Sequence, residues 1–262
     1  MSFASVAAAF LLAEVALAAI MSAAWAVQRA TDATGWIDAV WTFGVGATGA
    51  ALAALPLGGG SGWRRAVVAL AIALWGLRLG AHIVARTRKA PDDPRYRRLI
   101  EAWGAAAPLR LFGFLQAQAL VGAVLAVSVA LAAHAPPAAL RVQDAVGLVL
   151  FAVALAGESA ADAELARFKA NPANRGRICD VGLWGRSRHP NYFFEWLVWA
   201  AIAVAATEGG VGLLAWVAPA LMYVVLRYFS GVPPLEEHMV RTRGEAFRAY
   251  QLRTPVFFPR VL

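Results

Sequence analysis

The chain contains seven apolar segments that are each long enough to cross a lipid bilayer as a helix. A membrane helix needs roughly 20 apolar residues, and these segments have roughly 17 to 25 each. With 60% hydrophobic and 15% charged residues, the composition excludes an ordinary soluble domain. We therefore predict an all-α, polytopic membrane protein with one domain over residues 1–262. The predicted spans are residues 4–27, 36–57, 65–86, 109–134, 143–164, 191–207 and 210–230.

The basic residues lie unevenly among the loops, and this pattern predicts the orientation of the chain. If the N-terminus is outside, most of the 24 Lys and Arg residues fall on the inner side. The predicted location is the bacterial inner (plasma) membrane, with a cytoplasmic C-terminus. Since topology explains the net charge of +8, nucleic-acid binding is not indicated. The same basic side would suit a polyanionic cofactor.

The chain has short connections between its spans, and its few Cys and His residues indicate neither an internal disulfide nor a metal site. Glycines at 58–62 and prolines at 136–137 predict turns between spans. A single cysteine, Cys179, forms no disulfide within the chain. Four histidines, without a pair at metal-ligand spacing, predict no metal site.

Residues 186–199 carry the most informative pattern in the chain, because a basic stretch changes there into an apolar helix that still contains an acid. Proline suits the first helical position, so the pattern predicts a helix from Pro190. Asn191, Glu195 and Trp199 then share one face. Glu195 lies about one turn inside the apolar region, where an ionised carboxylate needs a compensating partner.

Arg186 and Arg188 precede the free N–H groups of this predicted helix, an arrangement that attracts phosphate. The alternative interpretation is a stop-transfer boundary. In that case the arginines lie at the lipid headgroups and Glu195 is paired internally.

A second polar pattern runs along residues 75–86. Trp75, Arg78, His82 and Arg86 recur every three or four residues and form a stripe on an apolar helix. Arg78 is too deep to reach water comfortably, so we expect it to meet an acid or an anionic ligand. For the charged stretch 92–98 that follows, a solvated surface loop is one interpretation and a functional role is the other.

Further acids fall inside or beside the other spans. Glu14 is a lone acid in the first span and faces either a substrate or another helix. Asp38 and Trp41 share a face at the start of the second span, where a buried carboxyl would act as a proton donor. Glu158 and Asp162 also share a face and require nearby cations.

Several segments resemble the bacterial membrane relatives of steroid 5-alpha-reductases. They are residues 37–41, 75–78, 93–96, 165–174, 182–195 and 230–237. The likeness covers most of the chain, and residues 188–192 read Arg-His-Pro-Asn-Tyr. Similar stretches also occur in membrane sterol reductases and in isoprenylcysteine-type methyltransferases.

The resemblance implies seven helices around an NADPH pocket that opens to the cytoplasm. It further implies reduction of a carbon–carbon double bond conjugated to a ketone, in a 3-oxo-4-ene steroid or an isoprenoid-like enone. Hydride would go to the beta carbon, while a side chain near the ketone oxygen supplies a proton. Residues 65–262 would mainly hold the cofactor, and residues 1–86 would mainly hold the substrate.

Carried over by position, Asn191 and Glu195 match the nicotinamide end of the family's site, and Arg78 and Arg227 match its buried arginines. The implied cofactor-binding residues are Arg78, His82, Lys89, Asp162, Arg167, Lys169, Arg186, Arg188, His189, Asn191, Tyr192, Glu195 and Arg227. The candidates for catalysis are Asp38, Trp75 and Glu195. Those for substrate binding are Glu14, Asp38, Trp41 and Trp75.

The substrate half departs from the family pattern. The steroid enzymes hold the enone with a Gln-Glu pair on the second helix and a Tyr on the third. Here residues 52–56 read Leu-Ala-Ala-Leu-Pro, and Trp75 falls at the position of the Tyr. The resemblance therefore implies the cofactor more directly than it implies the substrate.

Two other functions remain open at this point. A methyltransferase would hold S-adenosylmethionine, whose sulfonium cation prefers acids and aromatics, whereas the many arginines favour the phosphates of a dinucleotide. The second alternative is a non-enzymatic transporter or lipid-binding protein. The expected partners are the lipid bilayer and a lipophilic small molecule, without metal or nucleic acid, and a monomer suffices for this arrangement.

Overall fold

The computed structural model describes residues 1–90, 92–136, 139–208 and 210–260. Over these ranges the chain forms helices, turns and loops, and no strand. Six helical segments within the described ranges are long and apolar enough to cross a membrane, which confirms an all-helical, multi-pass membrane protein. These segments are Phe3–Thr31, Trp36–Ala54, Gly62–Lys89, Pro94–Ala133, Val142–Ala170 and Gly210–Arg243.

The segment predicted as the sixth of seven spans, residues 191–207, forms helix α8 (Pro190–Ala206). It has 17 residues and is strongly apolar, but it is shorter than the six segments above. At about 1.5 Å per residue, it is close to the lower limit for a membrane span.

The chain folds into two compact units. Unit 1 comprises Met1–Asp144 and Ile202–Ala218, and unit 2 comprises Ala145–Ala201 and Pro219–Leu262. The chain passes from one unit to the other within helices α6 (Val142–Ala170), α8 and α9 (Val217–Val224).

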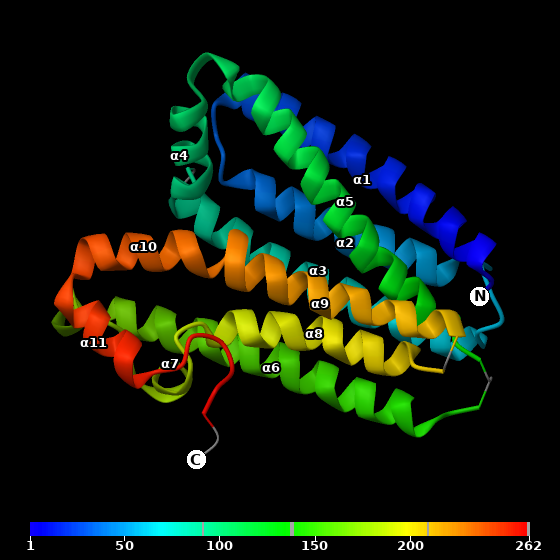
Figure 1. The fold of residues 1–262 in the computed structure, drawn as a ribbon. Coiled ribbons are helices and arrows are strands. Elements are labelled where there is room, and N and C mark those ends of the chain that lie inside the picture. The colour runs from blue at the N-terminus through cyan, green and yellow to red at the C-terminus, as the bar shows by residue number, and fades with distance from the viewer. Residues whose placement is uncertain (91, 137–138, 209, 261–262) are drawn as a thin grey trace. The chain divides into compact units, whose positions relative to one another are not determined.

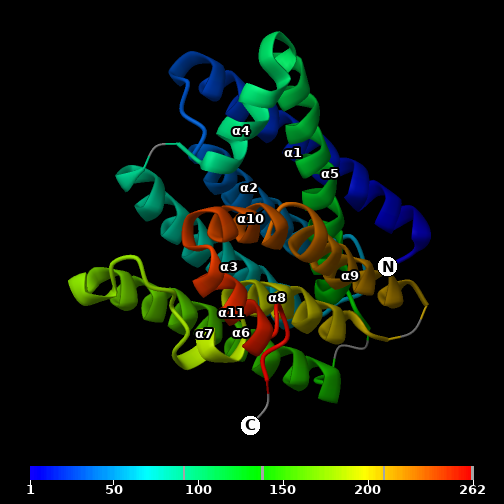
Figure 2. The ribbon, with the colours of Figure 1, turned by 60° about the vertical axis from the view of Figure 1, so that its left-hand side comes forward.

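Unit 1 is built on four long helices that lie alongside one another (Figures 1 and 2). They are α1 (Phe3–Thr31), α2 (Trp36–Ala54), α3 (Gly62–Lys89) and α5 (Ala107–Ala133). The short helix α4 (Pro94–Trp103) and the 3₁₀ turn η1 (Gly104–Ala106) join α3 to α5, and a second 3₁₀ segment, η3 (Gly210–Trp216), packs near α5. The buried residues of α1 recur every three or four positions, so one face of this helix meets its neighbours.

Helices α2 and α3 approach most closely at two glycines. A Cβ atom added to Gly46 would lie 3.1 Å from the Cα of Gly76, and one added to Gly76 would lie 3.2 Å from the Cα of Gly46. Small residues let helix backbones pack closely in a membrane, where lipid itself is as apolar as leucine. This contact sets the spacing of the two helices that carry Asp38 and Arg78.

The end of unit 1 that holds the N-terminus of α1 is closed by a loop and by ion pairs. A Cβ on Gly58 would touch Met1 and His134, so the predicted turn at 58–62 packs on the end of α5. Arg64 and Arg141 both bind Asp144, at 2.5 and 2.7 Å. The predicted turn at 136–137 lies partly outside the described residues.

Unit 2 contains most of α6, followed by short elements and two helices near the C-terminus. After α6 come the 3₁₀ turn η2 (Pro172–Asn174), helix α7 (Gly182–Arg186), and then α8, α9, the π-helical segment η4 (Val225–Phe229), α10 (Val232–Arg243) and α11 (Glu245–Arg253). Gly157 of α6 faces the ring of Phe194, because a Cβ at Gly157 would lie 2.2 Å from that ring. The prolines at 233–234 lie in the first turn of α10, where a missing N–H costs nothing.

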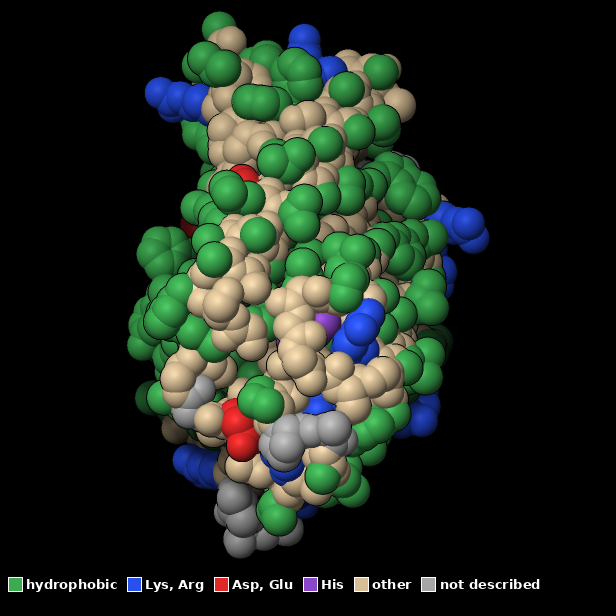
Figure 3. Space-filling model, turned by 90° about the vertical axis from the view of Figure 1, so that its right-hand side faces the viewer, with side chains coloured by type: hydrophobic (Ala, Val, Ile, Leu, Met, Phe, Trp, Pro, Cys, Tyr) green, Lys and Arg blue, Asp and Glu red, His purple; other side chains and the backbone are tan. Residues whose placement is uncertain are grey.

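Large apolar side chains are exposed on the long helices. Examples are Leu11, Val15, Leu70 and Val149, whose exposed fractions range from 62% to 72%. The face shown in Figure 3 is covered mostly by hydrophobic side chains, with only scattered charged groups. Such a surface matches contact with lipid acyl chains rather than with water.

Candidate functional site

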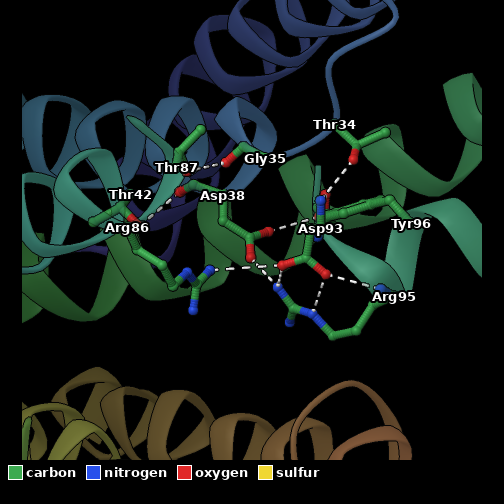
Figure 4. Close-up of polar contacts among 10 residues, drawn as sticks. Thr34, Gly35, Asp38, Thr42, Arg86, Thr87, Asp93, Arg95 and Tyr96 are labelled. Atoms are coloured by element: carbon green, nitrogen blue, oxygen red, sulfur yellow. Dashed lines mark hydrogen bonds and ion pairs between the residues drawn. The ribbon is translucent and has the colours of Figure 1, made fainter. Parts of the chain in front are cut away.

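A polar cluster connects α2, α4 and α5 within unit 1 (Figure 4). The Tyr96 hydroxyl donates to Asp38 Oδ1 at 2.7 Å, and Gln118 Nε2 donates to the Tyr96 hydroxyl at 2.9 Å. Arg95 forms an ion pair with the other oxygen of Asp38. Both Asp38 oxygens are therefore bound, although 21% of its side chain remains exposed.

Asp93 extends this cluster and begins α4. Its Oδ1 accepts from the backbone N–H and from Nε of Arg95, each at 2.9 Å, and its own N–H donates to Thr34 Oγ1 at 2.9 Å. Burial on its own would raise the pKa of Asp93, but the hydrogen bonds and charge of Arg95 outweigh burial and hold that pKa below its usual range. The carboxylate is thus a charged helix cap at neutral pH.

The interpretation of residues 92–98 as a solvated surface loop is wrong. A helix begins at Pro94, and both Asp93 and Tyr96 are buried. The charges of this stretch face Asp38 as well as water, which a charge count alone does not reveal. Arg97 is exposed, as expected for a surface position.

The remaining candidates in unit 1 differ in their exposure. Trp41 donates from Nε1 to the carbonyl of Gln118 at 2.9 Å, and Trp75 is completely buried. Arg78 is half-buried, whereas His82 and Lys89 are exposed, so the predicted stripe on α3 runs from the interior toward the surface.

Glu14 lies in the middle of α1 and is half-buried. Its Oε2 is buried and has no hydrogen-bond partner among the described residues. An acid at this depth is expensive in lipid.

The start of α8 in unit 2 holds the second polar cluster. Pro190 begins the helix as predicted. Immediately before it, Arg188 donates from Nε to Glu236 Oε1 at 2.7 Å and from Nη1 to the carbonyls of Gln251 and Thr254 at 3.1 and 2.6 Å. The guanidinium is thus bound on several sides by α10, α11 and the residues after α11.

Glu236 is the centre of this cluster because it accepts from three side chains. Besides Arg188, it binds His189 Nε2 at 3.0 Å and Gln251 Nε2 at 2.7 Å. A carboxylate with three donors is held in one position and fixes its partners in turn.

His189 is nearly inaccessible, with 3% of the residue exposed. Its ring stacks on that of Tyr192, with centroids 5.4 Å apart and planes 7° from parallel. Burial lowers the pKa of His189 and outweighs the opposite effect of Glu236, so the ring is neutral at pH 7. Its Nδ1 has no hydrogen-bond partner within the part of the chain that the structure describes.

Residues 254–260, which we call the C-terminal strap, bind along the approach to α8. The N–H of Arg188 donates to the carbonyl of Pro255 at 2.9 Å, and Ser187 Oγ donates to the carbonyl of Phe257 at 2.8 Å. Phe257 is buried and packs edge-on against Phe193. The strap therefore anchors the polar residues before α8 from outside the helix.

The other candidates in unit 2 lie on α6, α7, α8 and η4. Glu195 is buried and accepts from Trp199 Nε1 at 3.0 Å, and the two residues share a face of α8 as their spacing predicted. Asn191 and Asp162 are half-buried. Arg227 lies over the ring of Tyr228 at 4.9 Å, a cation–π contact.

One candidate, Arg188, differs from expectation in its partner. Arg188 was expected beside free N–H groups and ready for phosphate, but its charge is balanced by Glu236. Arg167, Lys169 and Arg186, by contrast, are exposed.

The sequence reasoning did not select Glu236, Gln251, Arg95 or Tyr96 as functional residues. Glu236 and Tyr96 lie in segments that carry the family resemblance, and this is the one signal that pointed to them. Their partners are 47 and 58 positions away in the chain, so no local spacing pattern reveals these contacts.

Comparison with known proteins places the chain in a family. A family model described as "Protein of unknown function (DUF1295)" matches residues 24–254. The chain belongs to the DUF1295 family. This DUF1295 protein is also 33% identical over 96 residues to an uncharacterized protein of Schizosaccharomyces pombe. That match covers 36% of the present chain and 28% of the yeast protein, and no solved structure matches.

Proposed function

We propose that this DUF1295 protein is an NADPH-dependent reductase of a carbon–carbon double bond conjugated to a ketone. Its substrate would be lipophilic, of the 3-oxo-4-ene steroid or isoprenoid enone type. The proposal joins the resemblance to steroid 5-alpha-reductases with the polar cluster at the start of α8.

The observation that carries the proposal is the braced start of α8. Glu236 binds both Arg188 and His189, and the residues that follow, Asn191 and Tyr192, are half-buried rather than sealed in the interior. A cofactor site needs polar groups held rigidly beside an accessible surface. These side chains match that requirement at the positions that the resemblance assigns to the nicotinamide end.

The charges around this helix start favour a dinucleotide over S-adenosylmethionine. Exposed cations occur along the end of α6 and the following segment to α7: Arg167, Lys169, Arg175, Arg177 and Arg186. Phosphates of NADPH would be attracted to this segment, whereas a sulfonium cation would be repelled.

When bound, NADPH supplies hydride to the beta carbon of the enone. Within unit 1, the Asp38 cluster has the chemistry of a proton donor, because the Tyr96 hydroxyl is a donor and Arg95 stabilises nearby negative charge. Trp75 is completely buried, so Asp38, with part of its side chain exposed, is the better candidate for contact with substrate.

We extend the proposal to topology. The end of unit 1 that carries Arg86, Arg88, Lys89 and α4 would face the cytoplasm, and α8 would be the seventh span. The membrane would be the bacterial inner membrane.

A thermal-shift assay of detergent-purified protein separates the candidate cofactors. NADPH at about 100 times its dissociation constant should stabilise the fold by roughly 2.7 kcal/mol, whereas S-adenosylmethionine should not. Stabilisation by S-adenosylmethionine alone would instead identify a methyltransferase, and a response to neither would favour a transporter or lipid-binding protein.

Turnover is the second half of the test. NADPH oxidation should follow addition of one of a panel of 3-oxo-4-ene steroids and isoprenoid enones. Asn191→Ala should remove the signal without lowering the melting temperature of the free protein. Arg248→Ala, on the exposed side of α11, is the control and should keep full activity.

A further inference from the structure

His189 combines complete burial with an incomplete set of hydrogen bonds. Its Nε2 lies 3.0 Å from Glu236 Oε1, while its Nδ1 has no partner among the residues described. Buried ring nitrogens are normally hydrogen-bonded, by protein, water or ligand. The open position on Nδ1 therefore indicates that a further group belongs there.

The carboxylate of Glu236 determines whether the group missing at His189 Nδ1 is a hydrogen-bond donor or an acceptor. Glu236 only accepts hydrogen bonds because it is ionised: burial would raise its pKa, but the hydrogen bonds from His189, Arg188 and Gln251 outweigh burial and lower that pKa to about 2. The hydrogen between Glu236 and the imidazole must therefore lie on Nε2. A neutral ring protonated at Nε2 presents Nδ1 as an acceptor, so the missing group is a donor.

The surroundings favour an uncharged donor. The guanidinium of Arg188 is bound to the same carboxylate as the ring, which disfavours a second cation beside it. The ring also lies parallel to Tyr192, so one face of the imidazole is covered and a group that reaches Nδ1 must approach in the plane of the ring.

We infer that His189 is a cofactor-binding residue whose Nδ1 accepts a hydrogen bond from the carboxamide N–H of bound nicotinamide, with Glu236 as the positioning residue that holds the required tautomer. The inference rests on the proposed function, because it needs a nicotinamide cofactor. The carboxamide is an uncharged N–H donor, as the site requires. Asn191, two positions further along the chain, is already assigned to the same end of the cofactor.

A matched pair of cofactors tests the contact. In 3-acetylpyridine adenine dinucleotide phosphate, reduced form, an acetyl group replaces the carboxamide and no N–H remains. The wild-type protein should bind NADPH roughly tenfold more tightly than this analogue, the ratio that one lost hydrogen bond to a buried acceptor gives. In His189→Phe the ratio should fall to about one, and in His189→Asn, which keeps a polar atom near the Nδ1 position, part of the preference should return.

Glu236 has its own test with a neighbouring control. Glu236→Gln should weaken the preference for NADPH over the analogue, because an amide can donate as well as accept and no longer fixes the tautomer. Glu237→Gln, one position along on an exposed side chain, should leave the preference unchanged. Equal loss in both variants would contradict a positioning role for Glu236.

A measurement without cofactor keeps the inference separate from the proposed function. Nitrogen-15 spectra of histidine-labelled protein, with four histidines in the chain, should show His189 protonated at Nε2 and unprotonated at Nδ1 at pH 7. The opposite tautomer would overturn the inference. If the tautomer is as stated but NADPH and the analogue bind equally, a buried water satisfies Nδ1 and the inference fails. If neither binds, the proposed function itself fails.

Discussion

Tyr96 on α4 donates a hydrogen bond to Asp38 on α2 at 2.7 Å, and this contact joins two helices that are 58 residues apart in the sequence. Gln118 of α5 completes the arrangement by donating to the same hydroxyl. The cluster thus links three helices of unit 1 through one phenol.

Loss of that phenol should destabilise the protein. Tyr96→Phe removes a hydroxyl with two partners and leaves Asp38 and Gln118 short of one hydrogen bond each. We expect a cost of about 1–3 kcal/mol, measured as a lower melting temperature in detergent. Asp92→Asn is the control, because its ion pair with Arg97 is largely exposed and should contribute less than about 1 kcal/mol. An equal effect of both changes would show that the Tyr96 cluster is not structural.

Two glycine substitutions should have opposite effects. Gly46→Ala places a methyl group 3.1 Å from the backbone of Gly76, so the helices must separate at a cost of about 1–3 kcal/mol. Gly113→Ala on α5 meets no atom within 4 Å and should stabilise the helix by roughly 0.5–1 kcal/mol. Thermal unfolding of the two variants beside the wild type measures whether each substitution lowers or raises the stability. A stabilised Gly46→Ala variant would contradict the close α2–α3 packing.

His189 should make stability depend on pH. Because burial lowers its pKa in the folded protein, the unfolded chain binds a proton first as the pH falls below about 6.5. The stabilising contribution is therefore complete above that pH and is lost as the pH falls toward the lower, folded pKa. The melting temperature of the wild type should drop more between pH 7 and pH 5 than that of His189→Asn.

The exposed His238 supplies a control for this pH effect. His238→Gln should keep the pH dependence of the wild type, because this side chain lies at the surface, away from the His189 cluster. If His189→Asn and His238→Gln showed the same dependence as the wild type, His189 would titrate normally and the account of its burial would be incorrect.

Cysteine accessibility tests the proposed orientation. The chain has one cysteine, Cys179, which Cys179→Ser removes. In that background, Arg248→Cys should react with a membrane-impermeant maleimide only in opened or inverted membranes, whereas Gly59→Cys should react in intact cells. Both positions are exposed. The reverse result would place the basic residues outside.

Local patterns in the sequence predicted the helices well, because an apolar run in lipid has few alternatives to a helix. Pro190 marked the start of α8, and the four-residue spacing of Glu195 and Trp199 predicted that they share a face, where they form a hydrogen bond. The weak point was α4, whose charges suggested a solvated loop. Its residues pair with Asp38 across the fold, and such pairing has no local signature.

The same limit applies to the candidate site. Residues 186–195 were recognisable from helix-start chemistry, but Glu236, the group that holds Arg188 and His189, lies on a later helix. Only folding brings its carboxylate to them. Function at such a position can be suggested by a resemblance, while its geometry needs the three-dimensional structure.

The C-terminal strap has a practical meaning for handling the protein. Its carbonyls at Pro255 and Phe257 accept hydrogen bonds from Arg188 and Ser187. A protease cut after α11 would therefore weaken the contacts between the strap and the residues that precede α8. Nicking at this place would leave every membrane helix intact while loosening His189 and its neighbours. A preparation that appears whole by its transmembrane content would then have lost these contacts, and mass spectrometry of the last peptide is the appropriate quality check.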